Sequence, residues 1–304
     1  MNFKIIILGS SSALPTSKRM PTSQIILYNK NPYLIDCAEG TQMQMRKNNI
    51  SLLRLKNIFI SHLHGDHFYG IFGLISSLNM LGREHDLNIY APEKLKEIYE
   101  SVLKLNNDIL KYKINFFPLC NSGKNLIFQN KNLEVYSFPL KHSKPVFGFL
   151  FSEKTGLLNI KKEVIEQYNL TIKQIIEIKN GCDLLLDNGE IIKNEIITYN
   201  PQKAKSYAFC TDTIPLYDLD RYLTEPDILY HEATFGSEYE EFAKATFHST
   251  ARQAAEVAKK VNAKKLIIGH FSSRYKNMSA LVDEAKAIFP NVFEANDGDI
   301  HEIV

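Results

Sequence analysis

Three histidines and one aspartate lie within six residues of the chain, at His62, His64, Asp66 and His67 in the segment "SHLHGDH". Imidazole nitrogens and carboxylate oxygens are ligands that zinc accepts, and a catalytic zinc site keeps one position open for water. The spacing lets His62 and His64 reach one metal ion while Asp66 and His67 reach a second. The segment therefore predicts a centre with two metal ions rather than a set of hydrogen-bonded polar residues.

The elements around this cluster indicate how it is positioned. An apolar run of strand length, residues 55–60, comes directly before it. Apolar residues at helical spacing follow it over residues 69–82. The cluster is thus expected on a turn between a strand and a helix, where alternate side chains point into one pocket.

Two metal ions need more ligands than this segment supplies, and three other apolar strands end in a suitable residue. His142 follows "VYSFPLK", Asp212 follows "YAFCT", and His270 follows "KLIIG". Strand ends converge at one edge of a sheet sandwich, so we expect all three in the same site, with Asp212 bridging both ions. The alternatives are that His142 is an exposed turn histidine, that Asp212 is a turn or cap residue, and that His270 is a hydrogen-bonded core histidine.

His248 precedes a helix start and is the predicted general acid, which would protonate a leaving oxygen. The alternative is a surface histidine near the helix cap. Glu232, in the segment "HEAT", is a candidate for orienting it. The remaining histidines are expected to be structural or to lie at the surface: His85, His231 and His301.

The rest of the chain alternates short apolar runs with turn signals and amphipathic segments. Strands are expected in two blocks, and helices are expected at 41–48, after the histidine cluster, at 92–106, at 249–261 and at 278–289. Thr250 and Gln253 match a capping box at the start of one helix. This order predicts an α+β fold in which two sheets pack face to face with helices outside.

Residues 152–206 interrupt this pattern and are expected to form an inserted arm that projects from the core. They contain eight lysines and eight acidic residues, so the arm carries no net charge. Asn188 and Gly189 lie between two apolar runs and predict a hairpin. The alternative is a solvated surface excursion without a function of its own.

Bulk composition narrows the class of protein. A net charge of +2 neither supports nor excludes a polyanionic partner. The four cysteines form no C-x-x-C pair, which is typical of a reduced, cytoplasmic protein. The first residues are expected to form a buried strand rather than a secretory leader, and no apolar run is long enough to predict a membrane span.

Further segments accompany the histidine cluster in a recognisable order and cover nearly the full length outside residues 152–206. "SHLHGDH" resembles the signature of the metallo-β-lactamase superfamily, and "HEATF", "HSTA" and "HFSSRY" together are much more specific. With them, the chain resembles the short form of the ribonuclease Z family, the tRNA 3′-processing endonucleases. The segments are "GSSSALPTSKRMPTS" (9–23), "LIDCAEGTQMQM" (34–45), "HLHGDHFYGIFGLISSLNMLGRE" (62–84), "LKHSKPVFGF" (140–149), "AFCTDT" (208–213), "HEATF" (231–235), "FHSTARQAAEVA" (247–258) and "IGHFSSRY" (268–275).

This resemblance implies a single metallo-β-lactamase-like domain over residues 1–304, an αββα four-layer sandwich, with 152–206 as an arm that grips tRNA. It also implies two Zn²⁺ ions per subunit and a homodimer. Asp66 would in addition accept a proton during the reaction. The first ion would be held by His62, His64 and His142, the second by Asp66, His67 and His270, and both by Asp212.

The implied substrate is precursor tRNA, cut just after the discriminator base to leave a 3′-hydroxyl on the tRNA. Lys18, Arg19 and Arg274 are candidate phosphate contacts, Arg274 above all because a guanidinium matches phosphate geometry. Family members often carry a Gly/Pro-rich tip on the arm, whereas "EQYNLTIKQIIEI" contains neither residue.

Two other functions compete with this one. A small-molecule phosphodiesterase, or another hydrolase of the same fold acting on thioesters or lactams, would need neither the long insertion nor "HFSSRY". A non-enzymatic RNA-binding or scaffolding subunit would be expected to have lost metal ligands, and every expected ligand is present.

Overall fold

The computed structural model describes residues 2–106, 109–201 and 203–303. Its contacts divide the chain into two compact units. The first unit contains residues 1–130, 134–151 and 205–304, and the second contains residues 131–133 and 152–204. Each unit is described by itself below.

The first unit contains a seven-stranded sheet that begins with antiparallel pairs and continues with parallel ones. Strands β18, β1, β2 and β3 pair antiparallel, and β3 to β6 pair parallel. The strands, in spatial order, are β18 (Ile300–Ile303), β1 (Phe3–Gly9), β2 (Ser23–Tyr28), β3 (Asn31–Ile35), β4 (Asn57–Phe59), β5 (Leu87–Ala91) and β6 (Ile114–Pro118).

A second sheet of seven strands belongs to the same unit. Strands β14, β15, β16 and β17 run parallel, so their carboxyl ends meet at one edge. The strands, in spatial order, are β17 (Val292–Glu294), β16 (Leu266–Gly269), β15 (Ile228–Glu232), β14 (Ser206–Cys210), β9 (Phe147–Glu153), β8 (Leu133–Pro139) and β7 (Asn125–Gln129).

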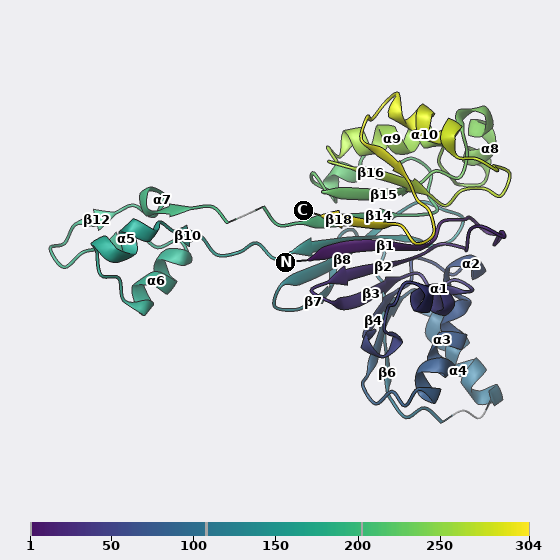
Figure 1. Ribbon diagram of the computed structural model, residues 1–304, viewed down its shortest axis with the longest axis horizontal. Helices are drawn as coiled ribbons and strands as arrows, with labels where there is room; N and C mark the ends of the chain where they lie inside the picture. The colour runs from purple at the N-terminus through teal and green to yellow at the C-terminus, as the bar shows by residue number, and fades with distance from the viewer. Residues whose placement is uncertain (1, 107–108, 202, 304) are drawn as a thin grey trace. The chain divides into compact units, whose positions relative to one another are not determined.

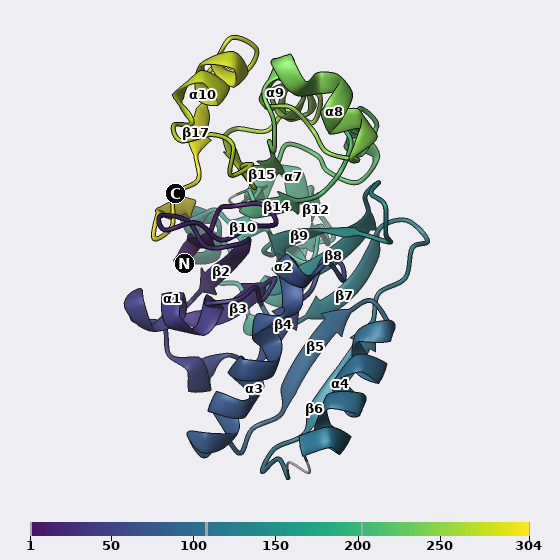
Figure 2. The same ribbon diagram turned by 90° about the vertical axis from the view of Figure 1, so that its right-hand side faces the viewer.

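Helices cover the outer face of each sheet (Figures 1 and 2). Apolar side chains of α1, α3 and α4 pack on the first sheet, and those of α9 and α10 pack on the second. The helices of this unit are α1 (Thr41–Lys47), α2 (Gly65–Phe68), α3 (Gly70–Met80), α4 (Lys94–Asn106), α8 (Glu240–Ala245), α9 (Ala251–Lys260) and α10 (Ser279–Lys286), with short 3₁₀ turns η1 (Leu52–Arg54), η2 (Leu219–Arg221) and η3 (Ser237–Tyr239).

Aromatic side chains join the inner faces of the two sheets. Phe59 of β4 packs edge-on against Phe149 and Phe151 of β9, with ring centroids 5.7 and 5.2 Å apart. Such edge-to-face pairs favour a defined packing between layers. The two sheets and the two helical layers form the four-layer sandwich that the sequence predicts.

Most elements of the first unit agree with the sequence prediction. The capping box at α9 is present, because the Thr250 hydroxyl accepts from the backbone of Gln253 and the Gln253 side chain accepts from the backbone of Thr250. The sequence analysis did not predict β6, β7, β17 or β18, which are short strands towards the edges of the sheets, half-exposed in part and therefore weakly patterned.

The second unit has a small apolar core of its own, formed by residues such as Val164, Ile178 and Ile197. The predicted hairpin is present, since Leu184 pairs with Ile192 across the turn that contains Gly189. The second run does not continue as a strand, because the Asp183 carboxylate accepts from the backbone N–H of Asn194 and a helix begins there. Its elements are β10 (Asn159–Ile160), α5 (Lys162–Gln167), α6 (Ile172–Lys179), β11 (Leu184–Leu185), β12 (Ile191–Ile192), α7 (Asn194–Ile197) and β13 (Thr198–Tyr199).

Across the part of the chain that the structure describes, we find no helix with both the length and the apolar character needed to cross a membrane.

Candidate metal centre and active site

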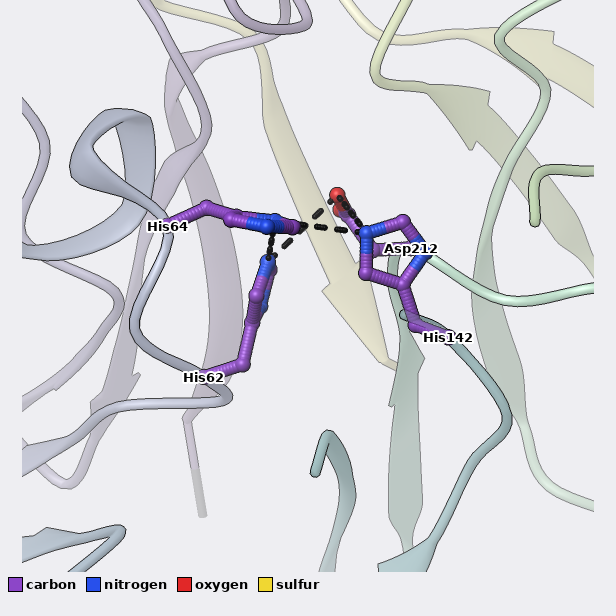
Figure 3. A group of neighbouring side chains, drawn as sticks. All are labelled: His62, His64, His142 and Asp212. Atoms are coloured by element: carbon purple, nitrogen blue, oxygen red, sulfur yellow. Dashed lines mark hydrogen bonds and ion pairs between the residues drawn. The ribbon is translucent and has the colours of Figure 1, made fainter. Parts of the chain in front are cut away.

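Four side chains from three separate segments converge on one point (Figure 3). Nδ1 of His64 lies 3.0 Å from Nε2 of His62 and 3.2 Å from Nε2 of His142. Oδ2 of Asp212 lies 3.5 Å from Nε2 of His62 and 3.8 Å from Nε2 of His142. These four atoms form a first ligand group with the donor types that zinc prefers.

A second group lies beside the first and shares Asp212 with it. Nε2 of His67 lies 3.4 Å from Oδ2 of Asp66, and Nε2 of His270 lies 3.8 Å from the same oxygen. Oδ1 of Asp212 lies 3.2 Å from Nε2 of His67 and 3.1 Å from Nε2 of His270. One oxygen of Asp212 thus faces each group, which is the arrangement that a bridging ligand requires.

The strands place these residues because their carboxyl ends meet at one edge of the sandwich. Asp212 follows β14, His270 follows β16, and the segment with His62 follows β4. Asp212 and His270 adopt left-handed backbone conformations, with φ of 40° and 60°. Non-glycine residues rarely adopt such a φ, and this strain is typical of functional sites.

The site's electrostatics favour a bound cation. Burial is the main cause that lowers the pKa values of His62, His64 and His142, so these imidazoles are neutral and keep a free lone pair. Burial also opposes a charge on His67, but the surrounding carboxylates, with Asp212 first, raise its pKa well above its usual range. The carboxylates of the second group therefore favour a bound positive charge.

Two buried nitrogens support the same conclusion. Nε2 of His67 and Nε2 of His270 are buried and make no hydrogen bond of suitable geometry among the described residues, although Oδ1 of Asp212 lies 3.2 and 3.1 Å from them. An unpartnered buried polar atom is costly, and a metal ion would satisfy both atoms. The residues present therefore fit a metal centre with two positions.

Asp36 is a functional residue that the sequence analysis missed. Its fully buried carboxylate lies 2.7 Å from Nδ1 of His67 and accepts from the backbone and the hydroxyl of Ser61 at 2.7 and 2.9 Å. A carboxylate behind a ligating histidine orients the ring and directs its second nitrogen to the metal. The position of Asp36 at the end of "PYLID" was an available signal, because other strand-end residues contribute to the candidate ligand groups.

His248 and Glu232 form a buried pair at the edge of the centre. Nδ1 of His248 lies 2.8 Å from Oε1 of Glu232. Burial acts to lower the pKa of His248, but the charge of Glu232 and this hydrogen bond raise it to about 9. His248 is therefore protonated at neutral pH, a state in which it could donate a proton, and its Nδ1 is hydrogen-bonded to Glu232.

Thr234 is a second residue that the sequence analysis did not single out. Its hydroxyl donates to Oε2 of Glu232 at 2.6 Å and lies 2.9 Å from Nδ1 of His270. The Nδ1–H of His270 thus has an acceptor, which leaves Nε2 for the ligand group. Thr234 thus links Glu232, the partner of His248, to His270 of the second ligand group.

The candidate phosphate contacts have three different environments. The Arg19 guanidinium donates to Ser10, to the carbonyl of Ala295 and to Glu294, so its donors are used within the chain. Lys18 is exposed beside it. The Arg274 guanidinium lies over three aromatic rings, 4.5 Å from that of Phe242.

An open pocket contains this centre. It is lined by His64, Asp66, His142, Asp212, His248 and His270 together with the aromatic side chains of Phe235, Phe242 and Phe247. The two candidate ligand groups and His248 are thus accessible from the same pocket.

Comparisons with known proteins agree on the fold. Residues 3–176, more than half of the chain, match a family model described as "Anti-Pycsar protein Apyc1". The chain therefore belongs to the family that this model describes. The crystal structure of human tRNase Z, short form, superposes with a TM-score of 0.71 at 22% identity, covering 98% of each chain. The metallo-β-lactamase fold protein YhfI from Bacillus subtilis gives a TM-score of 0.72 at 15% identity, covering 100% of each chain.

Sequence similarity identifies the family more closely. The chain is 44% identical over 297 residues to a ribonuclease Z from Parabacteroides distasonis, with 98% of both proteins covered. This level of identity over nearly the full length exceeds what a shared fold alone produces. The chain is therefore a member of the ribonuclease Z family, with the metallo-β-lactamase fold.

Proposed function

We propose that this protein is a tRNA 3′-processing endoribonuclease, which hydrolyses precursor tRNA just after the discriminator base and leaves a 3′-hydroxyl on the tRNA. The observation that carries the proposal is the pair of ligand groups joined by Asp212, with His248 at their edge. The family of the chain supports the choice of substrate.

The reaction follows from the roles of these residues. Two zinc ions held by the ligand groups would supply an activated water and neutralise the charge of the phosphate. His248 donates its Nε2 proton to the departing 3′-oxygen as the P–O bond breaks. Glu232 holds His248 in the protonated form and in the correct orientation. Asp66 is the candidate acceptor for the proton of the attacking water, since its carboxylate is ionised beside His67.

Contacts outside the centre complete the proposal. Lys18 and Arg274 are exposed cations that suit phosphate groups of the substrate, whereas Arg19 stabilises the loop that contains Lys18. The second compact unit, residues 152–204, is proposed to bind the body of the tRNA. The protein is proposed to act in the cytoplasm.

A homodimer is part of the proposal and has a candidate surface. Three large apolar side chains here are more than 60% exposed: Met43 of α1, Tyr69 directly before α3, and Met80 at the end of α3. Helices α1 and α3 contact each other. Exposed apolar side chains on neighbouring helices are candidates for an interface. Light scattering of the purified protein measures the oligomeric state directly.

Hydrolysis of small phosphodiesters is the second candidate function. It is favoured by one observation: all seven ligands and His248 belong to the first compact unit, so the centre needs nothing from the second unit. The family model matched by residues 3–176 is also not a ribonuclease Z model.

One experiment separates the two functions. A precursor tRNA with a 3′ trailer is incubated with the protein, with and without a zinc chelator, and the product ends are mapped. A single chelator-sensitive cut after the discriminator supports the proposal. No cut by protein that holds two zinc ions, together with hydrolysis of bis(p-nitrophenyl) phosphate, would replace it with the second function.

A further inference from the structure

The residue that directly precedes His248 in the chain is aromatic and has a strained backbone conformation. Phe247 directly precedes His248 and has a φ of 60°. An aromatic residue in the left-handed region is uncommon, because its Cβ crowds the backbone, whereas glycine adopts this φ without cost. Strained residues cluster at functional sites, which suggests a role for the backbone and the side chain of Phe247.

The backbone of Phe247 has a clear role. Its carbonyl lies 3.0 Å from Nδ1 of His142 and accepts the proton of that nitrogen, which directs Nε2 of His142 to the first ligand group. A glycine would supply the same carbonyl in the same conformation. The carbonyl therefore does not explain the phenyl ring.

The ring lies at the mouth of the pocket. It is 38% exposed, lines the same pocket as the metal ligands, and its centroid lies 6.4 Å from that of His142. Its neighbour His248 lies 5.0 Å from His142, measured between ring centroids. The exposed part of the ring is free to pack against a bound substrate.

The chemistry of His248 identifies which part of the substrate passes this ring. His248 protonates the departing 3′-oxygen, which belongs to the nucleotide on the 5′ side of the cut. The attacking water must lie on the opposite side of the phosphorus for an in-line displacement. Phe247 directly precedes His248 in the chain and lines the same pocket, so its ring is assigned to the side of the nucleotide that keeps the 3′-hydroxyl.

We propose that the Phe247 ring stacks on the base of the nucleotide directly 5′ of the scissile phosphate. The inference rests on the proposed function, because it needs a single-stranded RNA end in the pocket. Stacking on an aromatic ring is tolerant of base identity, since every base has a π-face. This suits a position that must accept different discriminator bases.

The test uses two precursor tRNAs, one intact and one with an abasic nucleotide directly 5′ of the cut. The ratio of their kcat/KM values measures how much the base contributes. We expect the wild-type protein to prefer the intact substrate by about 5- to 160-fold, from the usual strength of base–aromatic stacking. Phe247→Leu should reduce this ratio to about 1, whereas Phe247→Tyr, which keeps a ring, should retain it.

Phe293→Leu is the matched control. Phe293 is 43% exposed, close to the 38% of Phe247, but it belongs to β17 and does not line the pocket of the metal centre. The ratio for this variant should equal that of the wild-type protein. Because the ratio compares two substrates on one enzyme, a general loss of activity in any variant leaves it unaffected.

The outcomes separate this inference from the proposed function. If the wild-type protein cleaves both precursors equally well, or if Phe247→Leu retains the wild-type ratio, the stacking inference is wrong while the proposed function stands. If Phe247→Leu does not fold, the wild-type ratio together with that of Phe247→Tyr decides the question. If the wild-type protein cleaves no precursor tRNA, both proposals are wrong.

Discussion

Replacing Asp36 by asparagine tests how a buried carboxylate controls a metal ligand that it supports from behind. Oδ1 of Asp36 accepts from the backbone N–H of Ser61, while Oδ2 accepts from Nδ1 of His67. In Asp36→Asn the side-chain oxygen remains opposite the backbone N–H, so the amide nitrogen takes the place of Oδ2. This nitrogen presents a donor to Nδ1 of His67, which favours the tautomer with its proton on Nε2. That tautomer has no lone pair for the metal.

The expected magnitude follows from the contact that is lost. The hydrogen bond between Asp36 and His67 is 2.7 Å long and fully buried. Hydrogen bonds to charged groups contribute about 1.5–3 kcal/mol, and supporting residues behind metal ligands change metal affinity by about 10- to 100-fold. The two ranges agree, because each factor of ten in affinity corresponds to about 1.4 kcal/mol.

Zinc affinity is measured by competition with a chelator of known affinity, with the number of bound ions determined in parallel. We expect Asp36→Asn to weaken one of the two ions, the one held by His67, by about 10- to 100-fold. Asp86→Asn is the control, since Asp86 is an exposed carboxylate that accepts from Asn115 far from the ligand groups. Unchanged affinity for both ions in Asp36→Asn would refute the reasoning.

Three further predictions concern acid stability, proton donation and phosphate binding. Burial, followed by the charge of Lys265, lowers the pKa of His301 to about 4. The unfolded chain binds this proton near pH 6.5 and the folded chain does not, so the stability from neutral His301 is lost as the pH falls from about 6.5 to 4. The loss should be on the order of 1–2 kcal/mol after allowance for partial exposure, and absent in His301→Gln, as measured by urea unfolding at pH 7 and pH 4.5. His248→Ala should lower kcat by about 100-fold or more and leave zinc content unchanged; loss of a zinc ion would show that His248 is a ligand instead. Arg274→Gln should reduce the slope of log affinity for precursor tRNA against log salt concentration by about 0.7. Arg221→Gln is the control and should leave this slope unchanged. Arg221 also lies over an aromatic ring, but it is ion-paired with Asp218. An unchanged slope in Arg274→Gln would remove this residue from the phosphate contacts.

The sequence by itself determined the residue types and the local elements of the centre. His62, His64, Asp66 and His67 are neighbours in the chain, so their spacing reports a ligand cluster before any folding is considered. Asp212 and His270 were recognisable because each follows an apolar strand, and parallel strands bring their carboxyl ends to one edge. The structure brings these residues together, and the sequence marks them because periodicity and strand ends are local properties.

Only the tertiary structure decided which residues support the ligands. Asp36 lies 31 positions before His67, and Thr234 lies 36 positions before His270, so no local pattern connects either pair. Arg19 shows that distant contacts can also give a predicted binding residue a different role. It reads as a phosphate contact in a basic loop, yet its partners Glu294 and Ala295 lie about 275 positions away, where the end of the chain returns to the loop.

The division between what the sequence determined and what the tertiary structure decided has a physical reason. Ligand chemistry depends on the kind of side chain, which the sequence states directly. The direction in which a ligand presents its lone pair depends on a buried hydrogen bond to its other nitrogen, and that partner comes from whichever strand happens to pack behind it. For His67 and His270 these partners became visible only when the two sheets were in place.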